Sequence, residues 1–222
     1  LIRSSNVGTL MLAQKIGELD YKKFISETKL LNTSNFQLEE VGSPLPFDWN
    51  KCKLETISYG HGIAITPLQA TATYAALTNG GNIINPTLIE KTENRDNKKI
   101  ISPETSKTLN KILRKVVTEK EGTASLANIY GYDVGGKTGT SQKYGSKNEN
   151  LNTFISIFPA KNPKYALLIM LENPQVATDL TYNYRGMRIK GTRNEAGWNA
   201  VYTAGKIIEK IGPILAIKNK EF

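Results

Sequence analysis

The spacing of apolar residues changes near residue 130, and this change most constrains the fold. The clearest stretch before it has five apolar residues at helical spacing: Leu109, Ile112, Leu113, Val116 and Val117. After it, two runs rich in β-branched and aromatic residues, 152–160 and 165–171, flank the turn sequence 161–164, as in a hairpin. We therefore expect an α+β chain, with a helical part over about 1–130 and a strand hairpin and closing helix over about 131–222.

Capping signals predict where several of the helices begin and end. An apolar face over residues 7–16 predicts a helix that stops at Gly17, and a more polar helix follows over 20–30. Later starts are indicated by a capping box at 66–69 and by Ser102-Pro103-Glu104. The closing helix is expected over 197–211, where Gly212-Pro213 would break it.

The regions between these elements are expected to be loops. Residues 148–150 and 181–194 carry the composition of mobile loops. The second of these contains the densest basic set of the chain: Arg185, Arg188, Lys190 and Arg193. Such a set indicates either a solvated loop or contact with an anionic partner.

Composition excludes several classes of site. With one cysteine, Cys52, and one histidine, His61, the chain has no internal disulfide and no zinc site of the common Cys/His type, so we expect no metal and no cofactor. The net charge of +9 suits anionic partners, but no nucleic-acid-binding motif supports DNA or RNA as a partner. The longest apolar run, about seven residues, is far shorter than the ~20 that cross a bilayer.

The stretch GGKTGT at 135–140 has the residue types of an anion-binding strand. Lys137 supplies a cation, and Thr138 and Thr140 point to the same side because strand side chains alternate. Gly139, between them, has no side chain that would block an extended ligand from the strand backbone. The alternative for this stretch alone is an exposed β-turn.

A second polar cluster, Ser4-Ser5-Asn6, lies at the start of the chain. Serine and asparagine are good N-cap residues, so the triplet is suited to cap the helix that follows. Its alternative is part of an active site.

Taken together, these motifs resemble a known family. Ser4-x-Asn6 precedes Lys137-Thr138-Gly139 in the order found in penicillin-binding proteins. With SYGHGIAITPLQ at 58–69, YAALTNGG at 74–81 and FPAKNPKYALLI at 158–169, the chain resembles the transpeptidase domain of class B penicillin-binding proteins of the septal, penicillin-binding protein 3 type. The resemblance runs from Ser4 to the final helix.

The resemblance implies a fold and a set of roles. The fold is the penicillin-binding protein/serine β-lactamase type, an antiparallel sheet covered by helices on both faces. Two of its five strands lie before the nucleophile, so the chain would be a C-terminal portion with an exposed strand edge at 165–171. Catalytic roles fall to Ser4, Asn6 and Lys137; substrate binding falls to Thr138, Gly139 and Thr140.

The family's nucleophile motif, Ser-x-x-Lys, should precede Ser4. The match in this sequence, Ser26 to Lys29, follows the Ser-x-Asn motif and lies in a polar stretch, so we interpret it as a chance match, although its spacing would place both residues one helical turn apart. The chain would then lack its nucleophile and be inactive alone.

The implied partners are peptidoglycan stem peptides, β-lactam antibiotics and divisome membrane proteins. The implied location is the inner membrane, with the domain on the periplasmic side and the anchor outside this chain. A D-Ala-D-Ala carboxypeptidase or β-lactamase of the same fold remains an alternative. So does a non-catalytic sensor or divisome scaffold.

Overall fold

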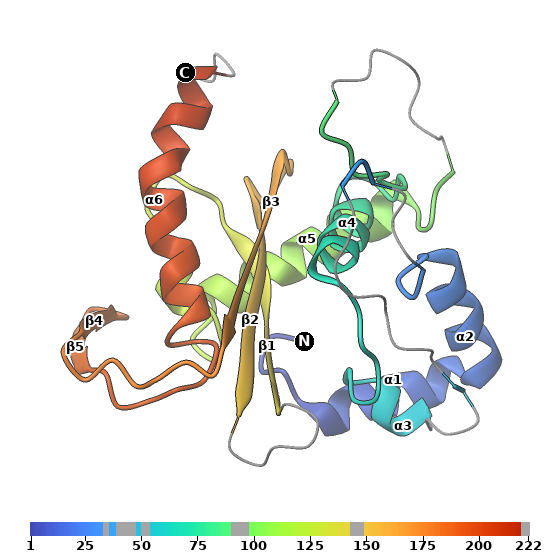
Figure 1. Ribbon diagram of the computed structural model, residues 1–222, viewed down its shortest axis with the longest axis horizontal. Helices are drawn as coiled ribbons and strands as arrows, with labels where there is room; N and C mark the ends of the chain where they lie inside the picture. The colour runs from blue at the N-terminus through green and yellow to red at the C-terminus, as the bar shows by residue number, and fades with distance from the viewer. Residues whose placement is uncertain (33–35, 39–47, 50–53, 90–97, 143–148, 219–222) are drawn as a thin grey trace. The chain divides into compact units, whose positions relative to one another are not determined.

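The computed structural model describes residues 1–32, 36–38, 48–49, 54–89, 98–142 and 149–218. They form two compact units, and each is described by itself (Figure 1). The first comprises Leu1 and Ser5–Leu109, and the second comprises Ile2–Ser4 and Asn110–Phe222. The boundary falls inside helix α5 (Pro103–Thr118).

The first unit is helical. Besides the start of α5, it contains α1 (Asn6–Ile16), α2 (Glu18–Glu27), α3 (Leu54–Ile57) and α4 (Pro67–Thr78). Helix α1 begins where the Ser5 hydroxyl accepts a hydrogen bond from the Gly8 N–H at 3.1 Å, and it packs on α2 and α3. It ends at Gly17, whose φ of 86° lies in the region that favours glycine. The predicted helix over 7–16 and its stop are confirmed.

Helix α4 begins as the capping signal predicts. The Thr66 hydroxyl accepts a hydrogen bond from the Gln69 N–H at 3.2 Å, and Pro67 takes the first helical position. The Gln69 side chain donates to the Lys29 carbonyl at 2.7 Å, which ties α4 to the turn after α2. Gln69 therefore takes part in the cap of α4 through its N–H and in the packing of the helices of this unit through its side chain.

The second unit is built on an antiparallel sheet with the strand order β1-β2-β3. Its strands are β1 (Gly135–Gln142), β2 (Asn150–Phe158) and β3 (Tyr165–Glu172). Thr138 lies opposite the buried Phe154, and Phe158 lies opposite Tyr165. The three strands and their hairpin are confirmed, and the strand order places β3 at an edge of this sheet, where the sequence predicts one.

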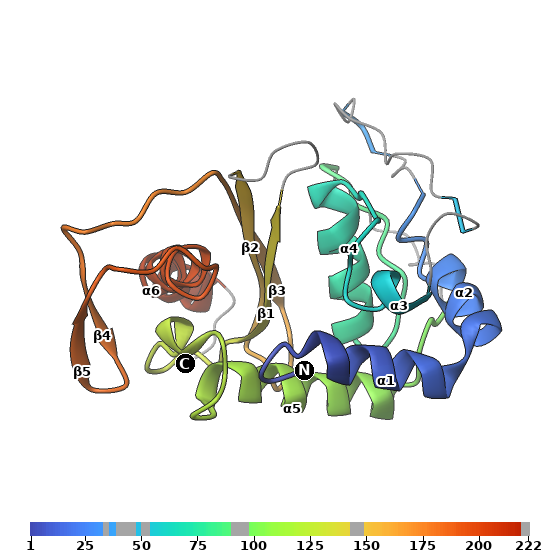
Figure 2. The same cartoon turned by 90° about the horizontal axis from the view of Figure 1, so that it is seen from below.

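Helix α6 (Ala200–Lys218) packs against β2 and β3, and Figure 2 shows it beside one face of the sheet. Between them lies the core of the unit, to which the end of α5 and the 3₁₀ helix η1 (Ser125–Ala127) also contribute. Its largest buried side chains include Phe154, Val116, Val117, Val134, Val201 and Ile208. Burial of these apolar side chains is the main force that holds the unit together. The α+β class and the antiparallel sheet are confirmed.

The prediction of a loop over residues 181–194 is wrong. Two short strands, β4 (Thr181–Tyr184) and β5 (Met187–Lys190), form a separate antiparallel pair. Arg185 and Gly186, at φ 55° and 80°, make the two-residue turn between them. Positive φ at both central residues matches the twist of a tight hairpin.

The predicted end of the last helix is also wrong, because α6 continues through Pro213 to Lys218. Proline removes one helical hydrogen bond, but its φ is compatible with a helix. Gly212 serves packing instead, since a Cβ there would lie 2.3 Å from the ring of Tyr132. Among the helices that the structure describes, none is long and apolar enough to cross a membrane.

Candidate active site

Strand β1 brings Lys137 to Ser4, which is 133 residues away in sequence. The Lys137 ammonium donates to the Ser4 hydroxyl oxygen at 2.7 Å and to the Thr138 carbonyl at 2.8 Å. Ser4 has a φ of 55°, an uncommon conformation for a residue with a side chain and one that recurs at functional sites. The structure thus joins the two motifs that the sequence separates.

The Lys137 side chain is partly buried, and burial lowers its pKa. A lysine with a lowered pKa releases its proton more readily than one in solution. While it is protonated, its charge acts directly on the Ser4 oxygen and stabilises negative charge there. Such a contact is the geometry that a proton relay through Ser4 would need.

The two threonines of β1 are also engaged. The Thr138 hydroxyl lies 2.8 Å from the Thr123 hydroxyl, and the Thr140 hydroxyl accepts a hydrogen bond from the Ala196 N–H at 3.3 Å. Alternation along the strand places Thr138 and Thr140 on one face. Both have oxygen lone pairs, and Thr138 has a hydroxyl proton whose direction its neighbour decides.

The glycines of this strand are required by the sheet itself. A Cβ at Gly139 would lie 2.5 Å from the Thr153 hydroxyl on β2, and a Cβ at Gly136 would lie 2.6 Å from the Ile155 carbonyl oxygen. The sequence interpretation gave Gly139 the role of leaving the backbone open to a ligand. The structure adds that the neighbouring strand already occupies the space beside it.

The Ser4-Ser5-Asn6 triplet caps a helix and also contacts Lys137. Ser5 caps α1, while Ser4 belongs to the second unit and contacts Lys137. Asn6 is the exposed first residue of α1, in the first unit. Its part in the site stays a prediction.

The other candidates fall outside this cluster. Helix α2 ends at Glu27, so Lys29 lies beyond it, with a φ of 55° that is not helical. Both Ser26 and Lys29 are exposed. His61 lies exposed in a turn of the first unit, and Cys52 lies outside the described residues. In the parts of the chain that the structure describes, no three His, Cys, Asp or Glu side chains gather as metal ligands would.

A network of asparagines holds the segment that contacts Thr140. The buried Asn152 of β2 donates to the Asn194 carbonyl at 2.6 Å and to the Asn199 side chain at 3.2 Å. Asn199 in turn accepts from the Ala200 N–H at 2.7 Å, at the start of α6. These bonds fix residues 194–200 and so place the Ala196 N–H against Thr140.

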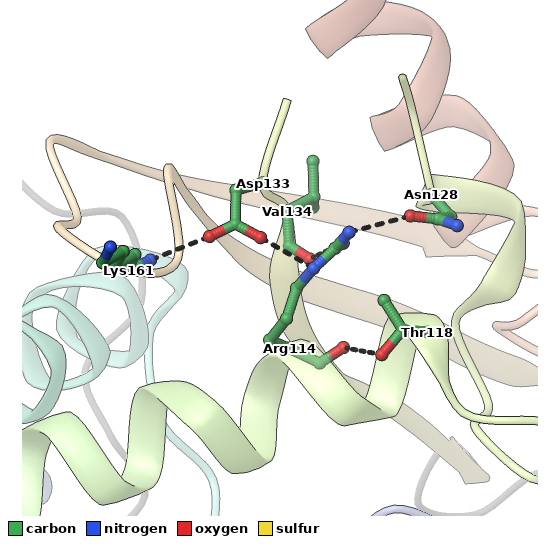
Figure 3. Close-up of polar contacts among 6 residues, drawn as sticks. All are labelled: Arg114, Thr118, Asn128, Asp133, Val134 and Lys161. Carbon is green, nitrogen blue, oxygen red and sulfur yellow. Dashed lines mark hydrogen bonds and ion pairs between the residues drawn. The ribbon is translucent and has the colours of Figure 1, made fainter. Parts of the chain in front are cut away.

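Arg114 of α5 fixes the entry to β1 (Figure 3). Its guanidinium pairs with Asp133 at 2.7 Å and donates to the Val134 carbonyl at 2.8 Å and to the Asn128 side chain at 3.1 Å. Asp133 also accepts from the Lys161 N–H at 3.1 Å, in the turn between β2 and β3. The Arg114–Asp133 pair thus joins α5, the segment before β1 and the β2–β3 turn.

Sequence reasoning missed two contacts of this cluster. Thr123 reaches Thr138, and Glu121 pairs with Arg3 at 3.1 Å, next to Ser4. Both Thr123 and Glu121 come from the polar stretch after α5, which carries no periodicity and no motif considered in the sequence. Only the fold brings them to the site.

Comparison with known proteins matches most of the chain to penicillin-binding proteins, as the motifs in the sequence indicate. Residues 1–190 match the family model described as penicillin binding protein transpeptidase domain. The chain is 32% identical to the probable peptidoglycan D,D-transpeptidase FtsI of Caulobacter vibrioides, over 98% of this chain and 38% of that protein. It is also 32% identical to penicillin-binding protein PbpB of Mycobacterium tuberculosis, over 88% of this chain and 32% of that protein.

Solved structures agree in fold. The ampicillin complex of Mycobacterium tuberculosis penicillin-binding protein 3 superposes with a TM-score of 0.75 at 27% identity, covering 94% of this chain and 49% of that one. The apo transpeptidase domain of Burkholderia pseudomallei penicillin-binding protein 3, at 20% identity, shares the fold with a TM-score of 0.77, over 95% and 62% of the two chains. The chain spans less than two-fifths of the two curated relatives named above. On the extent of the family match, the chain belongs to the penicillin binding protein transpeptidase domain family.

Proposed function

We propose that the protein is a peptidoglycan D,D-transpeptidase of the division septum that works through a serine acyl-enzyme. The observation that carries this proposal is the 2.7 Å contact between the Lys137 ammonium and the Ser4 hydroxyl, which joins the two family motifs in one cluster. The names of the related proteins, FtsI and PbpB, support the septal assignment.

In the proposed reaction, a nucleophilic serine attacks the carbonyl of the penultimate D-Ala of a stem peptide. A bond forms between the serine oxygen and the carbonyl carbon, and the bond to the terminal D-Ala nitrogen breaks. The serine hydroxyl loses its proton as it attacks, and the departing nitrogen gains one as D-Ala leaves. The amine of a second stem peptide then attacks the ester carbonyl and loses a proton, the bond to the serine oxygen breaks, and that oxygen regains its proton, which gives the cross-link.

The residues of the cluster have distinct proposed roles. Ser4 relays protons to the leaving amine and from the attacking amine, and Lys137 sets the potential that makes this relay possible. Thr138 and Thr140 bind the substrate carboxylate, beside the close-packed Gly139. Asn6 hydrogen-bonds the substrate amide. The Thr140 N–H is one oxyanion donor, an interaction worth about 3–4 kcal/mol of barrier in other acyl transfers.

The nucleophile is proposed to lie upstream of Ser4 in a Ser-x-x-Lys motif, as the order of motifs in the family implies. The exposure of Ser26 and Lys29 supports this placement over the match inside the chain. We propose the inner membrane as the site of action, with the domain on the periplasmic side, where stem peptides and divisome membrane proteins are its partners.

β-Lactams are the proposed inhibitors, since their strained amide resembles the D-Ala-D-Ala bond and their carboxylate fits the proposed threonine site. Support comes from the related Mycobacterium tuberculosis penicillin-binding protein 3, whose structures include complexes with ampicillin and with aztreonam.

Covalent labelling with a fluorescent penicillin tests the proposal. The full-length natural protein and residues 1–222 are treated in parallel, and the labelled peptide is identified by mass spectrometry. Label on a serine upstream of Ser4, in the longer protein only, is the expected result. Label at Ser26 overturns the proposed motif order, and a folded full-length protein that takes no label favours a non-catalytic scaffold.

A second assay separates transpeptidation from hydrolysis. A D-Ala-D-Ala pentapeptide is offered with and without an excess of a D-amino acid as amine acceptor. We expect the exchanged peptide to be the main product when the acceptor is present. Release of free tetrapeptide at an unchanged rate would assign the protein to the carboxypeptidases.

A further inference from the structure

The loop between α5 and η1, residues 119–124, lies between the two halves of the cluster. On one side, the Thr123 hydroxyl is 2.8 Å from the Thr138 hydroxyl of β1. On the other, Glu121 pairs with Arg3 at 3.1 Å, one residue before Ser4. This α5–η1 loop therefore contacts both motif-bearing segments of the second unit.

The α5–η1 loop is closely packed. A Cβ at Gly122 would lie 2.2 Å from the Val116 carbonyl oxygen, and the Ala124 N–H donates to that same carbonyl at 3.1 Å. A Cβ at Gly197 would lie 2.7 Å from the Thr123 carbonyl oxygen, so the segment before α6 also presses on it. Such packing leaves the loop little freedom to move Thr123 away from Thr138.

Arg185 clamps the same loop from a distant part of the sequence. Its guanidinium donates to the Glu119 carbonyl at 2.8 Å and to the Gly122 carbonyl at 3.3 Å. Arg185 occupies the turn of the β4–β5 hairpin, where its φ of 55° directs the chain back. The hairpin thus holds a loop that itself contacts the candidate active site.

We propose that the α5–η1 loop is the positioning element of the active site, with Thr123 orienting the Thr138 hydroxyl and Arg185 fixing the loop. A hydroxyl has one proton, so in a hydrogen bond between two hydroxyls one donates its proton and the other accepts it. When Thr123 donates to Thr138, the Thr138 proton is free to point at a substrate carboxylate. When Thr123 is absent, that proton turns to other acceptors and the carboxylate loses a preorganised donor.

This inference rests on the proposed function, and its test uses full-length natural protein with two ligands. The second-order acylation rate is measured for a penicillin and for its methyl ester, which lacks the anionic carboxylate. Thr123→Val is expected to slow acylation by the free acid by about five- to tenfold, the scale of one lost hydrogen bond, and to change the ester much less. Thr123→Ser keeps the hydroxyl and is expected to restore the rate.

A double-substitution cycle separates positioning from general damage. Thr123→Val should have no further effect in a Thr138→Val protein, because it acts through that hydroxyl. Thr118→Val, at the last residue of α5, where the hydroxyl donates to the Arg114 carbonyl, is the matched control and should keep the wild-type rate. Additive effects of Thr123→Val and Thr138→Val would overturn the inference.

Arg185→Met gives an independent readout of the clamp. It should lower the acid-to-ester rate ratio in the same direction as Thr123→Val, because both disturb one hydroxyl. Acylation of the wild type with an unchanged ratio in both variants would overturn the inference and leave the proposed function standing. A wild-type protein that is not acylated by either ligand would overturn the proposed function and this inference with it.

Discussion

The chain has two pairs of a lysine and a serine, Ser26 with Lys29 and Ser4 with Lys137, and the two pairs differ in exposure and in local structure. Ser26 and Lys29 lie at the end of α2, exposed to solvent, with Lys29 beyond the last helical residue. Lys137 lies on a paired strand and is partly buried, and its ammonium contacts the Ser4 oxygen at 2.7 Å. The first pair is close in sequence, whereas the second is assembled by the fold.

The difference is the reason why we propose Ser4 and Lys137, and not Ser26 and Lys29, as the pair that acts in the reaction. Spacing of three residues places two side chains on one face only while a helix continues, and α2 does not continue to Lys29. Around Lys137, burial lowers the pKa, and strand pairing fixes the backbone. Reactivity therefore follows the surroundings of the lysine, and the following predictions test that statement.

The largest expected effect is that of Lys137→Met. Loss of the ammonium removes the charge that acts on Ser4. The rate at which penicillin acylates the full-length natural protein should therefore fall by about 10²–10³-fold, the scale of general acid–base catalysis. Lys29→Met is the matched control and should leave the rate unchanged. Stopped-flow measurement gives the acylation rates of the two variants, and thermal melting confirms that each variant is folded.

Similar losses for Lys137→Met and Lys29→Met would contradict the comparison. They would mean that the exposed pair takes part in the reaction as much as the pair on β1. A loss for Lys29→Met alone would transfer the catalytic role to the end of α2.

A smaller but still large effect is expected for Ser4→Ala, with Ser26→Ala as its control. Removing the Ser4 hydroxyl takes away one of the two oxygen acceptors of the Lys137 ammonium and breaks the proposed proton relay, so the acylation rate of the full-length protein should fall by about 10²-fold. Ser26→Ala alters an exposed side chain and should change nothing. An active Ser4→Ala protein would leave Ser4 with only a structural role.

The next effect concerns stability. Gly139→Ala would place a Cβ 2.5 Å from the Thr153 hydroxyl and should lower the free energy of unfolding by about 1–3 kcal/mol, as overpacking does. Thr153→Ala removes the obstructing group, so the double variant should recover most of that loss. Urea unfolding measures the free energy of unfolding of the two single variants and of the double variant. An additive loss would show that the clash is not the cause.

Much of the scaffold around the active pair could be predicted from the sequence. Helix starts with a side-chain cap, such as Thr66 before α4, depend on neighbours in the chain, so local reasoning locates them. The strand that carries Lys137 was found because its motif and its period agree. The α+β class followed from the change of period alone.

What the sequence did not reveal depends on contacts between distant residues. Tyr182 and Tyr184 alternate just before the Arg185-Gly186 turn, as in a strand, but the composition of residues 181–194 led to the prediction of a loop. Pro213 was taken as a helix end, although packing of Gly212 on Tyr132 lets α6 continue. The contacts of Ser4 with Lys137 and of Thr123 with Thr138 exist only once the chain is folded.

The smallest expected effect is a pH dependence that separates Lys137 from a lysine in water. Burial lowers its pKa in the folded protein below the value of about 10.4 in the unfolded chain. Between these two pKa values the unfolded chain binds more protons, so the free energy of unfolding gains a contribution that rises with pH. Below the folded pKa the full cost of burying the charge is present.

Subtracting the urea-unfolding free energy of Lys137→Met from that of the wild type at each pH isolates this contribution, because the other titrating groups cancel. A difference that increases with pH up to about 10 is expected, whereas a flat difference would mean that the Ser4 and Thr138 oxygens compensate for the lost water and that Lys137 differs from Lys29 only in its neighbours.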